Sequence, residues 1–540
     1  MASSTRSQLV ESDTSATDAV AAGAVGLSAI LFALSLAALF EAVTISQPVA
    51  GVSAVTLLGG LLAVLGTAVV AFGVGSWLGY VETTPSSSAG LVAASVAAIA
   101  WFTVAGGVAS QTLGLGTAGG IVGGLLGGAV AFAATALTRE DLGSTVPVGA
   151  LCLLTGLVFA TGVIGPEWIW GLGWEQTASL TAEFVIPVAT LFATLFAGWA
   201  AAKAYGGFGA RGRRLGAYTL IYLNAISIVA FLFILVAFVV VQGLPGLFTG
   251  VQVGAGVGPQ TTIFGVSFTL PLSVPFVMNG VALLNDYQGV LPAIIGTIWL
   301  VIGAVLFAVP LGVGAAIFLT EYAERGRFTQ VVEIATNGLW STPSIVFGLF
   351  GFAFLVPRFG NRKSLLAGML TLGFMLLPLV VITSREAMVA VPDKYRDASV
   401  ALGVSRWETI KSVVLPAALP GVVTGVILGV GRIAGETAPI LLTMAGGTFV
   451  PGSQTVDVIG GFEFTAAPPF VANPELLQAT SALPYQLFAL ITAGVGLGDN
   501  VASPEQFRWA TALILLIVVL SFYAIGIATR YYFRNKLRHD

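Results

Sequence analysis

Charge is what this chain has least of. Only 9% of its 540 residues are Asp, Glu, Lys or Arg, whereas a soluble domain carries about 25%. The net charge is −3 and no strong basic cluster occurs, which argues against nucleic acid as a partner. A single histidine, His539, and a single cysteine, Cys152, provide neither an internal disulfide nor a His/Cys metal site. We expect no metal and no cofactor.

Two sequence patterns are missing as well. The chain has no G-x-x-x-x-G-K-[ST] phosphate-binding loop, so it carries no ATPase site of that kind. Residues 1–18 are polar and lack the basic start of a signal peptide, and we interpret them as an uncleaved, polar, cytoplasmic N-terminus. What the chain has instead is apolar length: 56% of its residues are hydrophobic and its mean hydropathy is +0.96.

Apolar runs of about 20 residues, enough to cross a bilayer core of about 30 Å, recur along the chain. They predict an all-α, polytopic membrane protein with about twelve transmembrane helices. A basic stretch, KAYGGFGARGRR, divides these helices into an N-terminal module, residues 19–205, and a C-terminal core, residues 211–535. The predicted spans are residues 20–43, 51–79, 90–110, 115–137, 146–165, 181–203, 216–242, 291–318, 336–357, 364–383, 417–442 and 508–530.

Lys and Arg, which favour the cytoplasmic side of a membrane, gather in alternate loops. They precede the seventh predicted span, follow the eighth, occur throughout a polar loop at residues 384–416 and close the chain, whereas loops 243–290 and 443–507 contain none. Twelve spans then place these basic groups and both termini in the cytoplasm, with the protein in the cell membrane. The loop with Arg358, Arg362 and Lys363 is an exception, because the same count places it outside.

The N-terminal module has few polar residues inside its predicted spans. In its clearest motif, GGIVGGLLGG, glycines recur every four residues in two rows: Gly119, Gly123 and Gly127, and Gly120, Gly124 and Gly128. Small residues at this spacing let helix backbones approach closely, so we interpret the motif as helix packing. The module shows no transport signature, and its role stays open.

The polar loop contains a compact helical element. Pro392 suits the first turn of a helix, and Gly403 suits the left-handed residue that ends one. Ser405 then caps a second helix, and Glu408 three residues later completes a capping box. We predict that this second helix ends near Leu415–Pro416.

Apolar side chains of this element are predicted to face water: Ala398, Ala401, Leu402, Trp407 and Ile410. Exposed apolar surface of this kind marks a partner site. From the residues alone, a solvated loop on the membrane surface remains an equal alternative.

The same loop resembles the coupling loop of ABC-importer permeases, which has the form E-A-A, three residues, G, nine residues, I, one residue, L-P. This chain has Asp397, Ala398 and Ser399, then Gly403, then Val413, Leu415 and Pro416 at that spacing, with Asp for Glu, Ser for the second Ala and Val for Ile. In that family the loop docks into a cleft of the ATPase subunit. The resemblance implies an ATPase-coupling loop that also includes Trp407 and Glu408.

Three further stretches, residues 289–323, 341–351 and 431–446, look like phosphate ABC-transporter permeases, particularly the PstA-type subunit. The resemblance covers about residues 211–535 and implies a MetI-like six-helix core with no catalytic residues of its own. The partners it implies are a second permease subunit of the PstC type, two copies of an ATPase subunit and an extracytoplasmic phosphate-binding protein. The PstC-type subunit shares several of these motifs, so it stays open whether this chain is the PstA-type or the PstC-type half of the permease pair.

Two ionisable residues, Arg432 and Glu436, lie four apart in the predicted span 417–442, and this spacing places them on one helix face. Because such a residue costs about 2.5–3.5 kcal/mol at mid-membrane depth, it should face a cavity or a partner. One interpretation is a pair that only neutralises itself. The other is a substrate pathway that includes Thr437, in which Arg432 offers forked donors to phosphate. Glu436 would then accept a hydrogen bond from the P–OH group of hydrogen phosphate, which sulfate lacks.

Pro343, in the predicted span 336–357, removes one backbone hydrogen bond and predicts a kink. Ser341, Thr342 and Ser344 can satisfy the carbonyls that the kink frees. Pore lining is the alternative role for this segment.

Three other functions stay open beside a phosphate importer. The first is a permease for another oxyanion, such as sulfate, molybdate or phosphonate. The second is an ion-coupled secondary transporter, although the two halves show no internal repeat and such a carrier needs no docking loop. The third is a membrane scaffold or sensor built on the N-terminal module.

Overall fold

The computed structural model describes residues 16–45, 47–49, 51–171, 179–263, 266–280, 289–324, 326–445, 455–468, 470–492 and 503–539. The predicted polar N-terminus, residues 1–18, lies almost wholly outside the described residues. The chain divides into two compact units, Met1–Leu235 and Val236–Asp540. This boundary lies inside a helix, whereas the sequence division lies at residues 205–211, and that domain assignment stays a prediction.

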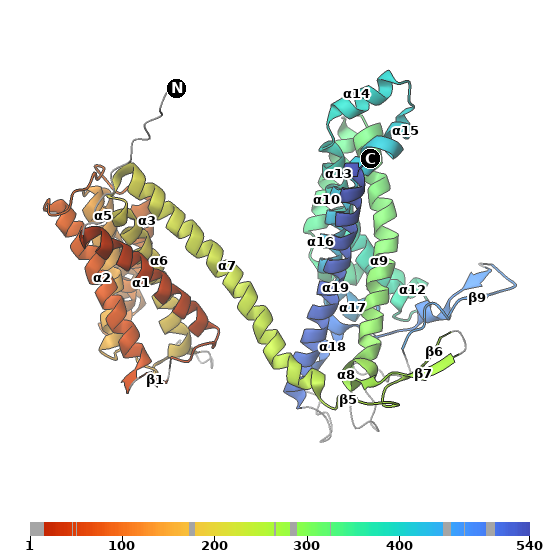
Figure 1. Cartoon of the computed structure of the whole chain (residues 1–540), viewed down its shortest axis with the longest axis horizontal. Coiled ribbons are helices and arrows are strands. Elements are labelled where there is room, and N and C mark those ends of the chain that lie inside the picture. The colour runs from red at the N-terminus through yellow and green to blue at the C-terminus, as the bar shows by residue number, and fades with distance from the viewer. Residues whose placement is uncertain are drawn as a thin grey trace, which may run out of the picture. The chain divides into compact units, whose positions relative to one another are not determined.

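The first unit is a helical bundle (Figure 1). Its helices are α1 (Ala16–Leu39), α2 (Ala54–Trp77), α3 (Leu91–Gly107), α4 (Gly116–Ala136), α5 (Glu140–Ala160), α6 (Ala182–Tyr205) and the first part of α7 (Gly209–Phe248). Two antiparallel strand pairs join helices, β1 (Pro48–Val49) with β2 (Val52–Ser53) and β3 (Ile169–Gly171) with β4 (Ser179–Thr181), and a π-helical turn η1 (Val108–Thr112) follows α3.

The long helices of the second unit are α9 (Leu291–Ile317), α10 (Arg327–Ser341), α13 (Leu365–Val389), α16 (Leu415–Ala434) and α19 (Pro504–His539). The short helices are α8 (Pro275–Met278), α11 (Ser344–Phe350), α12 (Val356–Arg358), α14 (Asp393–Ala401), α15 (Arg406–Thr409), α17 (Ala438–Thr443) and α18 (Leu483–Thr492). Turns η2 (Phe318–Tyr322), η3 (Gly351–Leu355) and η4 (Ile410–Val414) are π-helical, and η6 (Pro474–Leu477) is 3₁₀.

The second unit also contains short antiparallel strand pairs. They are β5 (Gln252–Val253) with β8 (Leu272–Ser273), β6 (Gln260–Ile263) with β7 (Val266–Thr269), and β9 (Glu463–Phe464) with β10 (Val471–Ala472). Figure 1 shows β5, β6 and β7 at the end of this unit opposite α14 and α15.

The chain is a multi-pass membrane protein. In the described part, 11 helices are long and apolar enough to cross a bilayer, or 12 if the bent pair formed by α10 and the segment Ser344–Arg358 counts as one span. This confirms the prediction of about twelve spans. Helix α7, at 40 residues, is much longer than one crossing requires.

Several predicted spans differ in their bounds from the observed helices. The fifth span was expected to begin at residue 146, but α5 begins at Glu140. The first turn of α5 contains two acidic residues, Glu140 and Asp141, and both are buried. The predicted span 336–357 bends by 101° between Ser341 and Ser344, where Pro343 interrupts the helix as expected. The predicted span 417–442 ends at Ala434, and α17 begins only at Ala438.

Close contacts of small residues hold the first unit together. A Cβ atom on Gly124 or Gly128 of α4 would collide with α3, at 2.8 Å from the Phe102 ring and 2.9 Å from the Ala98 carbonyl oxygen. The GGIVGGLLGG motif is therefore a packing motif, as predicted. Helices α2 and α5 pack closely in the same way, because Gly66 and Gly149 lie against each other's backbones.

The core of the second unit is built around α13. Its buried Leu372, Leu376 and Val380 pack with Leu300 and Ala304 of α9. Helix α16 covers another side of α13, where Gly429 approaches Leu376. Because residue 376 lies near the midpoint of α13, this contact places the last turns of α16 level with the middle of α13.

Candidate functional site

The polar loop folds into two short helices at the end of the second unit where α13 ends (Figure 1). Gly403 joins them with a φ of +74°, and nothing lies within 4 Å of where its Cβ would be. The left-handed backbone, rather than crowding, therefore requires glycine here. The Ser405 hydroxyl accepts a hydrogen bond from the Glu408 amide at 3.3 Å. These contacts confirm the predicted pair of helices and its glycine corner.

The second helix of the loop does not end at Leu415–Pro416 as expected. It continues through the π-helical turn η4 into α16, so that residues 406–434 form one helical segment. In a regular helix the ring of Pro416 would clash with the carbonyl four residues earlier, and a wider π turn relieves that clash. The Glu408 carboxylate accepts from the Ser412 hydroxyl at 3.0 Å, so only half of the predicted capping box forms. The loop is thus continuous with a membrane span.

The outer surface of the loop is apolar in part. Leu402 is 82% exposed and Trp407 is 56% exposed. Asp397 and Ala398 are exposed beside them, as is Ala401. Ile410 was expected to share this surface, but it is only 1% exposed because it lies where the second helix joins α16.

The remaining residues of the coupling motif form the base of the loop. Ser399 is buried, and its hydroxyl donates to the Tyr395 carbonyl at 3.1 Å. Val413, Leu415 and Pro416 are half-buried. Leu415 packs against a buried cluster that joins the loop to the ends of α9 and α13: Ala316, Met388, Val391, Val414 and Ala418. The motif therefore has an outward face and an anchoring face.

An ion pair that the sequence did not reveal fastens the loop to α9. Arg396 of α14 contacts Glu321 of η2 with 2.9 Å between Nη2 and Oε1. The same guanidinium donates to the carbonyls of Met388 and Val391, at 2.9 and 2.8 Å. Glu321 is 8% exposed and Arg396 21%. Because 75 residues separate the partners, no local pattern could have identified the pair.

Arg432 and Glu436 lie at the break between α16 and α17. Arg432 is in the last turn of α16, whereas Glu436 and Thr437 belong to the interruption, so the pair does not share one helix face as expected. Gly435 ends α16, and Pro439 cannot supply the amide that would continue it. Arg432 Nε lies 3.9 Å from Glu436 Oε1, too far for a hydrogen bond. Thr437 is half-buried.

The guanidinium of Arg432 stacks on the indole ring of Trp340, with 4.2 Å between Cζ and the ring centroid. Among the described residues it makes no hydrogen bond, and its side chain is 33% exposed. Arg432 is three residues beyond Gly429, which lies at the level of Leu376, so it is within about 5 Å of the midpoint of α13 along the helix axis. A cation with free donors thus lies deep in the second unit.

Two interrupted helices meet at this point. Trp340 precedes the bend at Pro343, and Gly348 of α11 packs on Pro439 at the start of α17. The hydroxyls of Ser341 and Thr342 both donate to the Gly338 carbonyl at 2.9 Å, which confirms the predicted compensation for these two of the three residues, while that of Ser344 stays a prediction. Non-helical backbone at membrane depth is tolerated only where protein covers it or where it lines a cavity.

The basic loop that departed from the charge pattern has structural partners. Lys363 donates to the Leu441 carbonyl near the end of α17, at 2.7 Å. Arg358 donates to the Phe354 carbonyl at 2.6 Å and stacks on the Phe354 ring. Both cations satisfy carbonyls near the ends of short helices, which gives these charges a role independent of topology.

A second ion pair, between Arg385 of α13 and Glu333 of α10, lies nearer the polar loop. It borders two cavities of about 530 and 690 Å³. Thr336, Asn337 and Glu386 also line the first cavity. Both cavities lie beside α10, which has no buried residue among those described.

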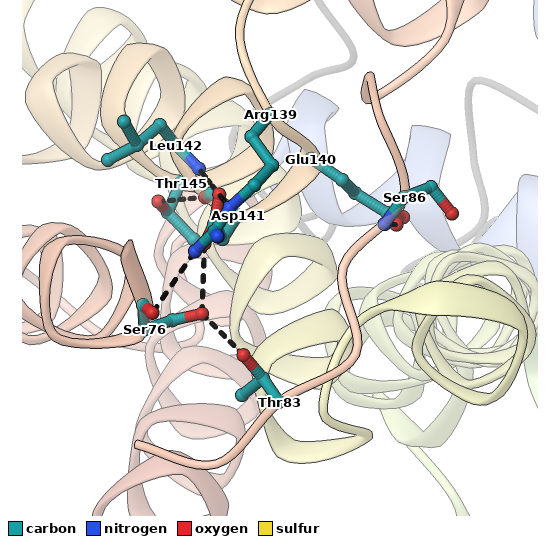
Figure 2. Close-up of polar contacts among 8 residues, drawn as sticks. All are labelled: Ser76, Thr83, Ser86, Arg139, Glu140, Asp141, Leu142 and Thr145. Atoms are coloured by element: carbon teal, nitrogen blue, oxygen red, sulfur yellow. Dashed lines mark hydrogen bonds and ion pairs between the residues drawn. The ribbon is translucent and has the colours of Figure 1, made fainter. Parts of the chain in front are cut away.

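The first unit buries charges that the sequence did not assign to its interior. Asp141 accepts from Arg139 Nε at 2.9 Å, from the Ser76 hydroxyl at 3.0 Å and from the Leu142 amide at 2.9 Å (Figure 2). The hydrogen bond to Asp141 and the negative charge of that carboxylate raise the pKa of the Arg139 guanidinium. Asp141 is fully buried, so its bonds replace those it would make with water.

Glu140, also fully buried, joins four segments of the first unit. Oε1 lies 2.8 Å from Lys203 Nζ of α6. Oε2 accepts from the amides of Ser86 and Gly209, at 2.8 and 3.1 Å, and lies 3.4 Å from Arg213 Nη1 of α7. Figure 2 shows Glu140 directed at the Ser86 segment. Every one of these contacts is structural, and none leaves the carboxylate free for a ligand.

No group of three or more His, Cys, Asp or Glu side chains is placed to hold a metal within the described ranges. Cys152 is buried, with its Sγ 3.4 Å from the Leu62 carbonyl oxygen. It serves as a small packing residue of the first unit.

Comparison with known proteins places the similarity in the second unit. The family model described as binding-protein-dependent transport system inner membrane component matches residues 308–539. The phosphate transport system permease protein PstA of Haemophilus influenzae is 31% identical over 252 residues, which are 47% of this chain and 78% of that protein. PstA of Yersinia pestis is 37% identical over 248 residues, 46% of this chain and 73% of that protein.

Two further matches are shorter or more distant. PstA 1 of Mycobacterium tuberculosis is 42% identical over 154 residues, 28% of this chain and 50% of that protein. Among solved structures, an inward-facing MetNI methionine ABC transporter matches 45% of this chain and 94% of its own, with 16% identity and a TM-score of 0.33.

Proposed function

Because the chain belongs to the family of binding-protein-dependent transport system inner membrane components, we propose that it is the permease subunit of an ATP-driven importer for inorganic phosphate. Members of this family are permease components of ABC transporters, so the chain is not itself an ATPase. Such permeases work with a separate ATPase and a binding protein. We place the permease core at residues 211–535, with residues 19–205 as an added module.

The observation that carries the proposal is the continuous helical segment 406–434. It begins in the polar loop, which exposes Leu402 and Trp407 for the ATPase, and it ends beside Arg432. A displacement of the loop by the ATPase is therefore transmitted along one helix to the candidate path. The ion pair of Arg396 with Glu321 makes α9 move with the loop.

Phosphate as the substrate rests on two supports. The relatives named for phosphate transport are 31–42% identical to this chain over the matched residues. Arg432 also offers free guanidinium donors, which match the oxygens of an oxyanion in a bidentate geometry. Its stacking on Trp340 holds the guanidinium in place without using those donors.

The path chemistry follows from the loose pair at the helix break. Arg432 Nε lies 3.9 Å from Glu436 Oε1, and an entering oxyanion takes the place of that carboxylate. Glu436 then accepts a hydrogen bond from the P–OH group of hydrogen phosphate, and the Thr437 hydroxyl donates to another oxygen. Sulfate has no such proton at neutral pH, so Glu436 disfavours it.

The orientation and the partners are part of the proposal. The polar loop and both termini face the cytoplasm of a cell membrane, in accord with the distribution of Lys and Arg. The loop, residues 384–416, docks on one of two ATPase copies. A second permease subunit of the PstC type completes the path, and an extracytoplasmic phosphate-binding protein delivers the substrate.

The test is uptake of labelled phosphate by cells that lack this chain and are restored with native protein, Arg432→Gln or Arg358→Gln. Arg358 is the matched control, because it also stacks on an aromatic ring but lies outside the candidate path. Native protein and Arg358→Gln should restore uptake. Arg432→Gln, present in equal amount, should lose about 10- to 100-fold, the effect of a lost charged hydrogen bond.

The outcomes separate substrate from site. If native protein restores uptake of labelled sulfate or molybdate but not of phosphate, the phosphate assignment is wrong. If both variants restore phosphate uptake equally, the importer stands and the site at Arg432 does not.

A further inference from the structure

An apolar groove of about 330 Å³ lies in the first unit. Its walls come from α3, α5, α6 and α7, with Ala93, Ala100 and Trp101 on α3 and Leu151 on α5. Of its fifteen lining residues only Lys203 and Arg213 are charged. The groove is therefore apolar, with two cations among otherwise uncharged walls.

The two cations lie at one end of the groove. Lys203 is near the end of α6 and Arg213 near the start of α7, which places both at the level where these spans leave the bilayer. They share one carboxylate, Glu140, with which both form ion pairs. Two positive charges against one negative charge leave a surplus of one. Arg211 and Arg214, both exposed, add to it.

Lys203 and Arg213 differ in what they can offer a ligand. Lys203 is 1% exposed and already contacts Glu140 and the Ser144 hydroxyl, at 2.8 and 2.7 Å. The Arg213 side chain is 51% exposed, and within the described part of the chain only its Nη1 is engaged, with Glu140 and the Ser86 hydroxyl. Its Nε and Nη2 can therefore donate to an added group. A phosphate diester suits a guanidinium fork of this kind.

We propose that this groove binds an anionic phospholipid, with an acyl chain along the apolar walls and the headgroup phosphate on Arg213. Membrane helices with basic pockets at their ends recognise anionic headgroups by charge. The groove selects the lipid by its headgroup, because an acyl chain gains little on leaving one apolar environment for another. The lipid would hold α3 against the start of α7.

The test uses the full chain in a neutral detergent, with phosphatidylglycerol or phosphatidylcholine of identical acyl chains added. Thermal unfolding and native mass spectrometry report stabilisation and bound lipid. Phosphatidylglycerol should bind native protein about fivefold more tightly than phosphatidylcholine, as expected for one cation near the surface. An excess of inorganic phosphate should not displace bound phosphatidylglycerol, which distinguishes a lipid site from a free-anion site.

Two pairs of variants locate the site. Arg213→Gln should abolish the preference for phosphatidylglycerol, whereas Arg211→Gln, on the same turn but outside the groove, should keep most of it. The double variant Ala93→Leu with Ala100→Leu fills one wall and should reduce retention of both lipids, whereas Ser95→Leu, exposed on the same helix, should not. Equal stabilisation by both lipids, or an unchanged preference in Arg213→Gln, would overturn the proposal. Because every readout is lipid binding, its failure leaves the transport function untouched.

Discussion

Each of the two units contains an ion pair between a basic residue and a glutamate in a membrane helix or at its end. The two pairs differ in distance, in exposure and in hydrogen bonding. In the first unit Lys203 and Glu140 lie 2.8 Å apart, with side chains 2% and 0% exposed. In the second, Arg432 and Glu436 lie 3.9 Å apart, with side chains 33% and 17% exposed. The first carboxylate also accepts hydrogen bonds from two backbone amides, whereas Arg432 donates to no group in the described part of the chain. A buried pair that joins several segments fastens helices, and a loose pair whose cation makes no hydrogen bond to any described residue is available to a ligand.

The largest expected effect is on the fastening pair. Glu140→Gln removes the carboxylate that compensates Lys203, and a buried charge left without its partner costs about 3–5 kcal/mol. Chemical unfolding of the purified protein in detergent should show a loss of that size. Glu82→Gln, an exposed acid in the same unit, should stay within about 0.5 kcal/mol of native protein. A loss below about 1 kcal/mol for Glu140→Gln would contradict the fastening role.

A surface kept for a partner should behave in the opposite way. Trp407 is 56% exposed on the polar loop, so Trp407→Ala should leave the unfolding free energy of the isolated chain nearly unchanged. Its truncation should weaken binding of the ATPase subunit by about 2 kcal/mol, or about 30-fold, if it is an anchor residue. Binding of purified ATPase to the permease in detergent measures this. Unchanged affinity would remove Trp407 from the docking surface.

The Arg396–Glu321 pair lies between the two extremes, because it is well formed yet joins the loop to α9. Glu321→Gln weakens a charged hydrogen bond and should lower phosphate transport per ATP hydrolysed by about tenfold, equivalent to about 1.5 kcal/mol. Reconstituted transporters allow both rates to be measured together. Glu324→Gln, an exposed acid three residues later, is the control. Equal losses of hydrolysis and transport would indicate a docking defect rather than lost transmission.

The smallest effect concerns substrate discrimination. Glu436→Gln keeps the size of the side chain but removes its charge, so it accepts the P–OH proton of hydrogen phosphate less well. The preference for phosphate over sulfate in competitive uptake should fall by about fivefold, the value of about 1 kcal/mol for one hydrogen bond. An unchanged preference would leave Glu436 as a counter-charge for Arg432 alone.

Local chemistry explains what the sequence predicted well. The helices of the polar loop follow from a glycine with φ of +74° and a serine cap, and both act within a few residues. The bend at Pro343 and the packing of the GGIVGGLLGG helix are equally local. The ATPase-coupling role of this loop rests on its resemblance to importer permeases and stays a prediction.

Tertiary contacts explain what the sequence missed. The apolar run 417–442 has the length of one span, and the break after Ala434 depends on Gly435 and Pro439 acting together with the neighbouring bent helix. The fastening pair of Glu140 with Lys203 and the pair of Arg396 with Glu321 each join residues more than 60 positions apart. No periodic pattern encodes such contacts, so the sequence assigned no charges to the interior of the first unit.

The comparison is tested most directly by measuring Arg432→Gln and Glu140→Gln in parallel, each reconstituted into proteoliposomes with the ATPase and the second permease subunit. ATP-driven phosphate uptake per folded transporter and the unfolding free energy are measured on the same preparations. Arg432→Gln should lose about 10- to 100-fold in uptake with stability within about 0.5 kcal/mol of native protein, and Glu140→Gln should show the reverse. An Arg432→Gln protein that transports normally, or that loses uptake only in proportion to its stability, would contradict the account.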